Sequence, residues 1–255
     1  MRRATGIRRV QRHFQCRSDE IIKTAAPLPP LSACGSEFPL SSIHFLLSVP
    51  ADEGSLAHRR HVLFRVIELD SLTDRLDLEK IFGRKAPVHI DLGCGDGSFL
   101  CALAQRMPQK NFLGIERLLN RIRASARRAS ALDNVRLLRI ESSYAVRYLL
   151  PVGSIEKFYL LFPDPWPKRR HHRRRIMRPD FLNAVHTALQ EAGSIYIATD
   201  DSDYFRSINE IAQSHRRFAI SETAGDLPLS RFGRLFQQKG AAIHSLELRK
   251  ISPVK

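Results

Sequence analysis

The chain has 255 residues, 43% of them apolar, enough for one large domain with an extension or for two small domains. No apolar run reaches the roughly 18–20 residues of a membrane-spanning helix, so we predict no membrane partner. The formal net charge is +15 and the pI is about 10.3, which favours a polyanionic partner such as nucleic acid.

Residues 1–60 show no periodic pattern of apolar side chains. Residues 1–18 contain six Arg, one His and no acid, which fits an organelle transit peptide, a basic arm that contacts RNA, or a start site placed too far upstream. We predict that residues 1–60 form a disordered basic extension and that residues 61–255 form the folded domain. The spacing of the cysteines fits neither a zinc site nor a redox pair, which indicates a reduced, cytoplasmic protein without a metal. These cysteines are Cys16, Cys34, Cys94 and Cys101.

The regular pattern begins at residue 88, after one short helical stretch. A short helix is predicted within 70–82, with Gly83 at its C-cap. Apolar runs that are typical of strands then alternate with helical stretches, which predicts a Rossmann-like, doubly wound, mostly parallel α/β sheet. The predicted strands are 88–92, 112–115, 135–140, 155–162 and 194–198, and the predicted helices are 98–107, 117–131, 142–150, 179–191 and 202–214. Two last runs, 218–222 and 243–249, suit an antiparallel hairpin at one edge, joined by a long loop without helical period.

The first strand of this pattern ends in a glycine-rich turn with the sequence Asp-Leu-Gly-Cys-Gly-Asp-Gly, residues 91–97. Gly93 and Gly95 allow a sharp turn and leave room for a ligand against the backbone. Ser98 stands where a dinucleotide fingerprint has its third glycine, and the Asp91 carboxylate would repel a pyrophosphate but attract an ammonium or sulfonium group. These features favour S-adenosyl-L-methionine over NAD as the cofactor.

The next two strands also end in acidic residues. Glu116 suits the ribose hydroxyls, because the acid at this strand end does so in nucleotide-binding folds. Glu141 suits the adenine amino group, although an ordinary surface glutamate explains it equally well.

Proline and then basic residues follow the fourth strand. Residues 162–167 read Phe-Pro-Asp-Pro-Trp-Pro and contain the only Trp, and residues 168–175 contain six Lys or Arg and two His. Proline ends sheet pairing, so Asp164, Trp166 and the cations should lie at a strand end, where open α/β sheets bind ligands. A solvated basic loop is the alternative for a charge run alone. Trp166 suits either stacking on a base or anchoring the loop in the core.

From residue 69 to residue 250 the chain resembles the bacterial tRNA (guanine-N7)-methyltransferase family. The segments that carry the resemblance are 91–97, 112–116, 162–168 with the following Arg/His run, and 198–200. The resemblance implies a class I S-adenosylmethionine-dependent methyltransferase domain and methylation of a guanine N7 in the tRNA variable loop.

The resemblance and the turn together assign candidate site residues. The cofactor residues would be Asp91, Gly93, Gly95, Glu116, Glu141 and Asp164. The substrate residues would be Lys168, Asp200, Ser230, Arg231, Phe232 and Gly233. The tRNA phosphate contacts would be Arg169, Arg170, Arg173, Arg174 and Arg175.

Three positions differ from the family pattern. Asp91 stands where the family usually has Glu, and Glu141 where it has Asp. The segment 230–233, Ser-Arg-Phe-Gly, matches the family's Thr-x-Phe/Tyr-Glu motif but lacks the carboxylate at Gly233.

Guanine N7 has an in-plane lone pair, so the reaction needs alignment rather than a base that removes a proton. We predict that Asp164 holds the guanine through its Watson–Crick edge and faces the developing positive charge; the alternative is an Asp that caps a turn. A non-catalytic RNA-binding protein with a vestigial cofactor pocket is a second hypothesis, kept open by Gly233. An NAD-dependent oxidoreductase is a third, disfavoured by Ser98 and by the lack of a hydride-site His or Tyr. We predict a monomer that acts on tRNA.

Overall fold

The structure, a computed structural model, describes residues 65–221 and 227–251. All of them belong to one compact unit of the chain, Ala51–Lys255. The predicted extension 1–60 lies outside the described residues, as do Cys16, Cys34 and the last residue of the predicted strand 218–222.

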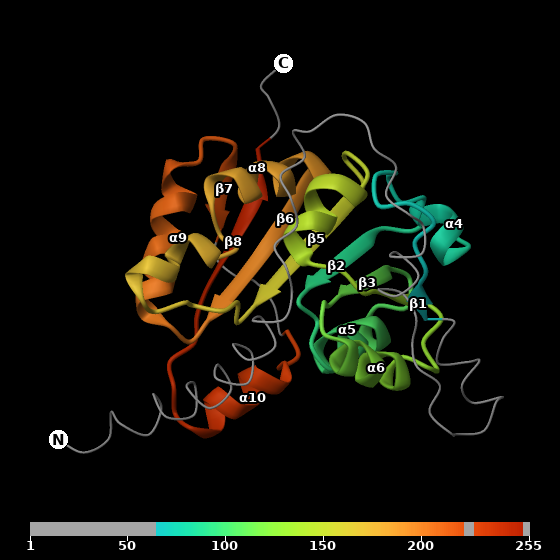
Figure 1. Cartoon of the computed structure of the whole chain (residues 1–255), viewed down its shortest axis with the longest axis horizontal. Helices are drawn as coiled ribbons and strands as arrows, with labels where there is room; N and C mark the ends of the chain where they lie inside the picture. Colours follow the sequence, from blue (N-terminus) through green and yellow to red (C-terminus); the bar gives the residue numbers. More distant parts are fainter. Residues whose placement is uncertain (1–64, 222–226, 252–255) are drawn as a thin grey trace. The chain divides into compact units, whose positions relative to one another are not determined.

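Eight strands form one sheet in the order β1-β4-β3-β2-β5-β6-β8-β7 (Figure 1). Neighbouring strands from β1 to β6 run parallel, and β8 runs antiparallel to both β6 and β7. The doubly wound α/β fold with an antiparallel pair at its edge is therefore confirmed. The strands are β1 (Val66–Ile67), β2 (Val88–Leu92), β3 (Asn111–Ile115), β4 (Val135–Leu138), β5 (Ile155–Leu161), β6 (Leu189–Thr199), β7 (Phe218–Ser221) and β8 (His244–Lys250).

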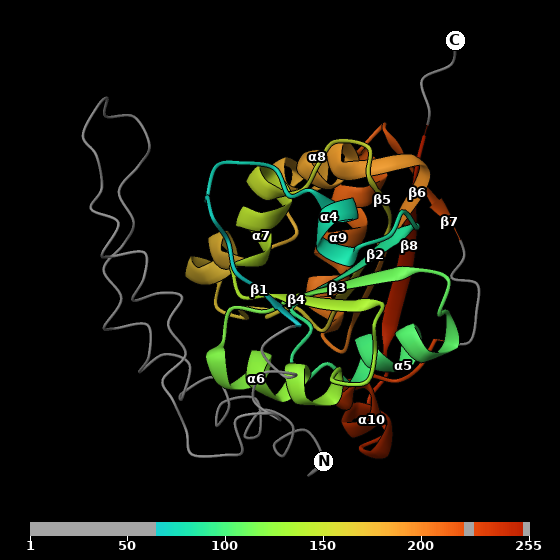
Figure 2. The ribbon, with the colours of Figure 1, turned by 90° about the vertical axis from the view of Figure 1, so that its right-hand side faces the viewer.

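Helices cover both faces of the sheet. Figure 2 shows α5 and α6 on one face and α4, α7, α8 and α9 on the other. The α-helices are α4 (Leu78–Phe82), α5 (Ser98–Arg106), α6 (Leu119–Arg128), α7 (Ser142–Tyr144), α8 (Pro179–Ala188), α9 (Ser202–Ser214) and α10 (Arg231–Gln238). A π-helical turn, η1 (Ala145–Leu149), follows α7, and a 3₁₀ helix, η2 (Arg169–Arg174), follows β5. No helix among the described residues is long and apolar enough to cross a bilayer.

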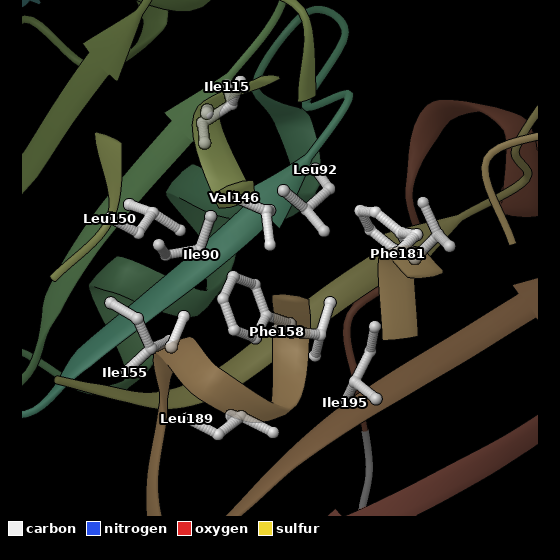
Figure 3. Packing of buried hydrophobic residues seen from close by; sticks show 14 of the residues in the cluster. Ile90, Leu92, Ile115, Val146, Leu150, Ile155, Phe158, Phe181, Leu189 and Ile195 are labelled. Carbon is white, nitrogen blue, oxygen red and sulfur yellow. The ribbon is translucent and has the colours of Figure 1, made fainter. Parts of the chain in front are cut away.

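Each face of the sheet has its own hydrophobic cluster. In the larger cluster, Phe158 of β5 lies among side chains from β2, β6 and the helical layer (Figure 3). Ile90, Phe158 and Ile195 are completely buried, and each such side chain contributes roughly 1.5–3 kcal/mol of transfer free energy. The buried strands hold the turns at their carboxyl ends in fixed positions.

Several predicted boundaries shift. Helix α8 ends at Ala188 because β6 begins at Leu189, five residues before the predicted strand. The predicted helix 142–150 is a short α-helix followed by the π-helical turn. The predicted helix within 70–82 is confined to α4, whose C-cap is Gly83 at φ 68° as expected.

The prediction of a long loop without helical period between the last two strands is wrong, because it contains α10. The side chain of Ser230 caps this helix by accepting a hydrogen bond from the Gly233 N–H at 3.0 Å. Phe232, Leu235 and Phe236 follow the helical spacing i, i+3, i+4 and give one apolar side. The period is present in the sequence but covers only two turns.

Candidate active site

The glycine-rich turn after β2 has the geometry that only glycine adopts easily. Gly93, Gly95 and Gly97 have φ values of 81°, 59° and 73°. The N–H groups of Gly93 and Cys94 both donate to the Ile115 carbonyl oxygen, at 2.8 and 3.0 Å, which holds the turn against β3. A Cβ on Gly97 would lie 3.0 Å from Cβ and Oγ of Ser125 on α6. The turn therefore presents bare backbone between two strand ends and α6.

Asp91 lies near the carboxyl end of β2, just before the glycine-rich turn. Its side chain is a buried carboxyl group, and the residue is 2% exposed. Its register partners are Gly114 on β3 and Tyr159 on β5. Burial, together with the nearby charge of Glu116, raises the pKa of Asp91 to about 8. A cation placed beside Asp91 would restore its ionised form, so the site suits an ammonium or sulfonium group.

Glu116 is also buried, at 4% exposed, and connects the turn to β3. Its Oε2 accepts a hydrogen bond from the Gly95 N–H at 3.2 Å, and its Oε1 accepts one from the Leu118 N–H at 2.9 Å. Because a carboxylate has about four acceptor sites, each oxygen still has one for a ligand hydroxyl.

Glu141 is exposed and caps α7. Its carboxylate oxygens accept hydrogen bonds from the N–H groups of Ser143 and Tyr144, at 2.9 and 2.7 Å. This capping role was not predicted, although an acid directly before the helix start at Ser142 is a usable signal.

The segment after β5 forms a loop around Asp164, which is exposed. Phe162 and Trp166 flank it with φ values of 51° and 43°, a left-handed conformation that costs a non-glycine residue of the order of 1–3 kcal/mol. The Phe162 N–H donates to the Ala198 carbonyl oxygen on β6 at 2.7 Å. We call residues 162–166 the Asp164 loop.

Trp166 packs against the basic run. The Arg174 guanidinium lies 4.8 Å from the centre of its ring, and the His171 ring meets it edge-on at 5.8 Å. The indole is half-buried, so it anchors the loop to η2 rather than to the hydrophobic core.

Most of the basic run is available to a ligand. Four guanidinium groups are exposed, and no acidic side chain among the described residues forms an ion pair with them. They belong to Arg169, Arg170, Arg173 and Arg174. Lys168, which precedes η2, is exposed as well.

Arg175 differs from its neighbours in the run. It is 8% exposed, and its Nε and Nη1 donate to the Pro165 carbonyl oxygen at 2.7 Å and to Ser207 Oγ at 3.1 Å. Its guanidinium lies 4.6 Å from the centre of the Tyr204 ring. These intramolecular partners occupy the group and distinguish it from the exposed cations of the run, whereas its contact with tRNA phosphate stays a prediction. The sequence gives no signal for partners that come from α9.

The segment 230–233 lies beside the Asp164 loop. A Cβ on Gly233 would be 3.6 Å from Cε2 of Phe162, and the rings of Phe236 and Phe162 are 5.2 Å apart. Figure 1 shows α10 beyond the arrowheads of β5 and β6.

The charge of the same helix acts on the glycine-rich turn. Burial raises the pKa of Asp96, but hydrogen bonds from Ser98 and the charges of Arg128 and Arg231 outweigh it, so the pKa is lowered overall. Helix α10 therefore packs against the Asp164 loop through Phe236 and places the charge of Arg231 near the glycine-rich turn. Asp200 directly follows β6 and is half-buried.

A separate cavity of about 430 Å³ opens at the amino-terminal ends of the parallel strands. Its lining includes His89, whose pKa falls to about 4 because of burial and the nearby Lys110. None of the predicted site residues lines it. Within the described part of the chain, no group of three or more His, Cys, Asp or Glu could hold a metal ion.

The chain is similar to several known proteins. Residues 85–246 match the family model described as "Putative methyltransferase". Two relatives described as "tRNA (guanine-N(7)-)-methyltransferase" come from Halorhodospira halophila and Nitrosococcus oceani. The first is 35% identical over 185 residues, which are 68% of this chain and 79% of that protein. The second is 30% identical over 211 residues, which are 79% of this chain and 86% of that protein.

A Thermotoga maritima relative with the same description is 34% identical over 181 residues, 69% of this chain. The match spans only 58% of that protein. The crystal structure of the 16S rRNA methyltransferase KamB has a TM-score of 0.52 over 70% of this chain and 95% of that one, at 16% identity. At this identity the likeness supports the fold alone.

Proposed function

Because this chain belongs to the tRNA (guanine-N(7)-)-methyltransferase family, we propose that it methylates N7 of a guanine in the variable loop of tRNA, with S-adenosyl-L-methionine as the methyl donor. One observation supports this most: α10 packs against the Asp164 loop while the charge of its Arg231 acts on Asp96 of the glycine-rich turn, so the proposed cofactor and substrate residues would share one edge of the sheet. We further propose that the enzyme acts as a cytoplasmic monomer.

The residues at the turn fit the proposed cofactor. Asp91 would pair with the ammonium of its methionine part, and Glu116 would accept hydrogen bonds from the ribose hydroxyls. The left-handed glycines leave the backbone of 93–97 without Cβ atoms, so a ligand can lie against it. Glu141 would reach the adenine amino group with an acceptor site that its capping bonds leave free.

When bound, the cofactor would supply an electrophilic methyl group on a positively charged sulfur to the lone pair of guanine N7. The methylated guanine would carry a positive charge. Asp164 would hold the N–H groups of its Watson–Crick edge and stabilise this charge. Lys168, Asp200 and the segment 230–233 would complete the base site.

The exposed guanidinium groups of η2 would bind tRNA phosphates next to the Asp164 loop. Such contacts release counterions, so affinity should fall steeply with salt. They place the tRNA without reading its sequence.

Replacing Asp164 tests its assignment. Asp164→Asn keeps the shape and removes the charge, and we expect methyl transfer at saturating cofactor to slow about 10²-fold. Asp203→Asn is a matched control, because its side chain is 81% exposed on α9. Single-turnover transfer of labelled methyl groups to unmodified tRNA gives the rates. Transfer at the wild-type rate by Asp164→Asn would remove Asp164 from the reaction.

A further inference from the structure

We propose that Arg175 is a positioning residue for methyl transfer. It fixes the far end of the Asp164 loop to α9, so that Asp164 keeps its place beside the bound guanine. The inference rests on the proposed function, since its readout is the methylation of tRNA.

Hydrogen bonds hold the backbone of the Asp164 loop on both sides of Asp164. On one side, the Phe162 N–H is bonded to the Ala198 carbonyl oxygen of β6 at 2.7 Å. On the other side, Arg175 Nε holds the Pro165 carbonyl oxygen, also at 2.7 Å. Between these points Pro163 fixes its own φ, and Pro165 restricts Asp164 to extended conformations. The orientation of Asp164 therefore depends on where the two anchors hold the loop.

The anchored peptide is also the one under strain. The Pro165 carbonyl belongs to the peptide bond that leads into Trp166, which has a φ of 43°. A left-handed non-glycine residue persists only where surrounding contacts hold it. The Arg175 hydrogen bond supplies such a contact, and Arg174 and His171 hold the Trp166 side chain.

The Arg175 guanidinium is itself held in place by residues of α9. Arg175 Nη1 donates to Ser207 Oγ at 3.1 Å, and the guanidinium lies on the fully buried Tyr204 ring. The Tyr204 hydroxyl in turn accepts the Met177 N–H at 3.2 Å. Helix α9 thus holds Arg175 from two sides.

This arrangement requires arginine. A guanidinium can donate in its plane to two acceptors while its face stacks on a ring. A lysine carries the same charge but no plane, so it cannot make all three contacts. The substitution Arg175→Lys therefore separates anchoring from charge.

The first experiment compares kcat and KM for tRNA at saturating S-adenosyl-L-methionine. For Arg175→Lys we expect kcat to fall about 10- to 100-fold with KM for tRNA nearly unchanged, because small misplacements cost rates of this size. Ser207→Ala removes one anchor bond and should lower kcat less. Arg206→Met, with a side chain 71% exposed on the same helix, should change neither value.

A phosphate contact behaves differently. Arg173→Met removes an exposed charge from η2, so we expect weaker tRNA binding and a shallower dependence of log affinity on log salt, by about 0.7–0.9. The salt dependence of Arg175→Lys should equal that of the wild type. In Arg175→Ala, added guanidinium should restore part of kcat relative to sodium chloride at equal ionic strength.

The outcomes are distinguishable. If the wild type methylates tRNA and Arg175→Lys keeps its kcat, the inference is overturned. It is also overturned if Arg175→Lys and Arg175→Ala lose kcat only in proportion to lost cofactor binding or lost folded protein, with no guanidinium rescue. A wild type that transfers no methyl group to tRNA contradicts the proposed function instead.

Discussion

Replacing Asp91 with Asn should make the protein more stable and less able to bind its cofactor. The native Asp91 carboxyl has a pKa of about 8, against an ordinary value of 3.8, because burial and Glu116 disfavour its ionised form. The unfolded chain ionises this group near pH 4. Between these pH values the unfolded state binds fewer protons than the native state, so stability is lost as pH rises.

The magnitude follows from the width of that interval. Each pKa unit corresponds to 1.36 kcal/mol, so the full shift amounts to about 5–6 kcal/mol, and relaxation around the charge should reduce it to about 2–5 kcal/mol. Asn does not titrate. The stability of Asp91→Asn relative to wild type should therefore increase by about 2–4 kcal/mol from pH 5 to pH 8. The shift of His89 is common to both proteins and cancels in this difference.

Thermal unfolding without cofactor at pH 5 and pH 8 measures this difference. For a unit of this size we expect the gap in Tm to grow by about 4–16 °C. At pH 8, S-adenosyl-L-methionine at about 100 times its Kd should stabilise the wild type by about 2.7 kcal/mol and the variant much less. A gap in Tm that is the same at both pH values, or a variant that binds cofactor as tightly as wild type, would refute the role of Asp91.

Two further substitutions test the turn and the basic run. Gly97→Ala should lower the free energy of unfolding by about 1–3 kcal/mol more than Gly83→Ala does, as measured by denaturant titration. Both residues have positive φ, but only at Gly97 would the new Cβ meet another residue, Ser125 at 3.0 Å; equal losses would show that the contact with α6 does not matter. Replacing Arg169 and Arg170 together by Ala should reduce the slope of log tRNA affinity against log salt by about 1.4–1.8, and an unchanged slope would mean that η2 does not bind phosphate.

The fold and the glycine-rich turn could be predicted because their signals are local. Each buried strand is an apolar run, and 91–97 carries the glycines that its left-handed φ values require. The parallel order of the strands then places Asp91 and Glu116 at one edge, since residues 92 and 115 are register partners. Strand β1 has only two residues, too few to show a period.

The role of Arg175 could not be predicted, because its partners are remote in sequence. Within the basic run all six cations appear equivalent. Only the packing of α9 against the Asp164 loop shows that one of them is buried. The position of α10 could not be predicted either, because its short apolar side packs against Phe162, which is remote in sequence.

The position of the transferred methyl group decides whether the proposed reaction occurs. Unmodified tRNA should be incubated with the full chain and S-adenosyl-L-methionine labelled in its methyl group, and the labelled nucleotide then mapped by digestion. We expect a single N7-methylguanosine in the variable loop, strongly reduced with Asp164→Asn. Tight tRNA binding without label transfer, or label at another atom or another base, would contradict it.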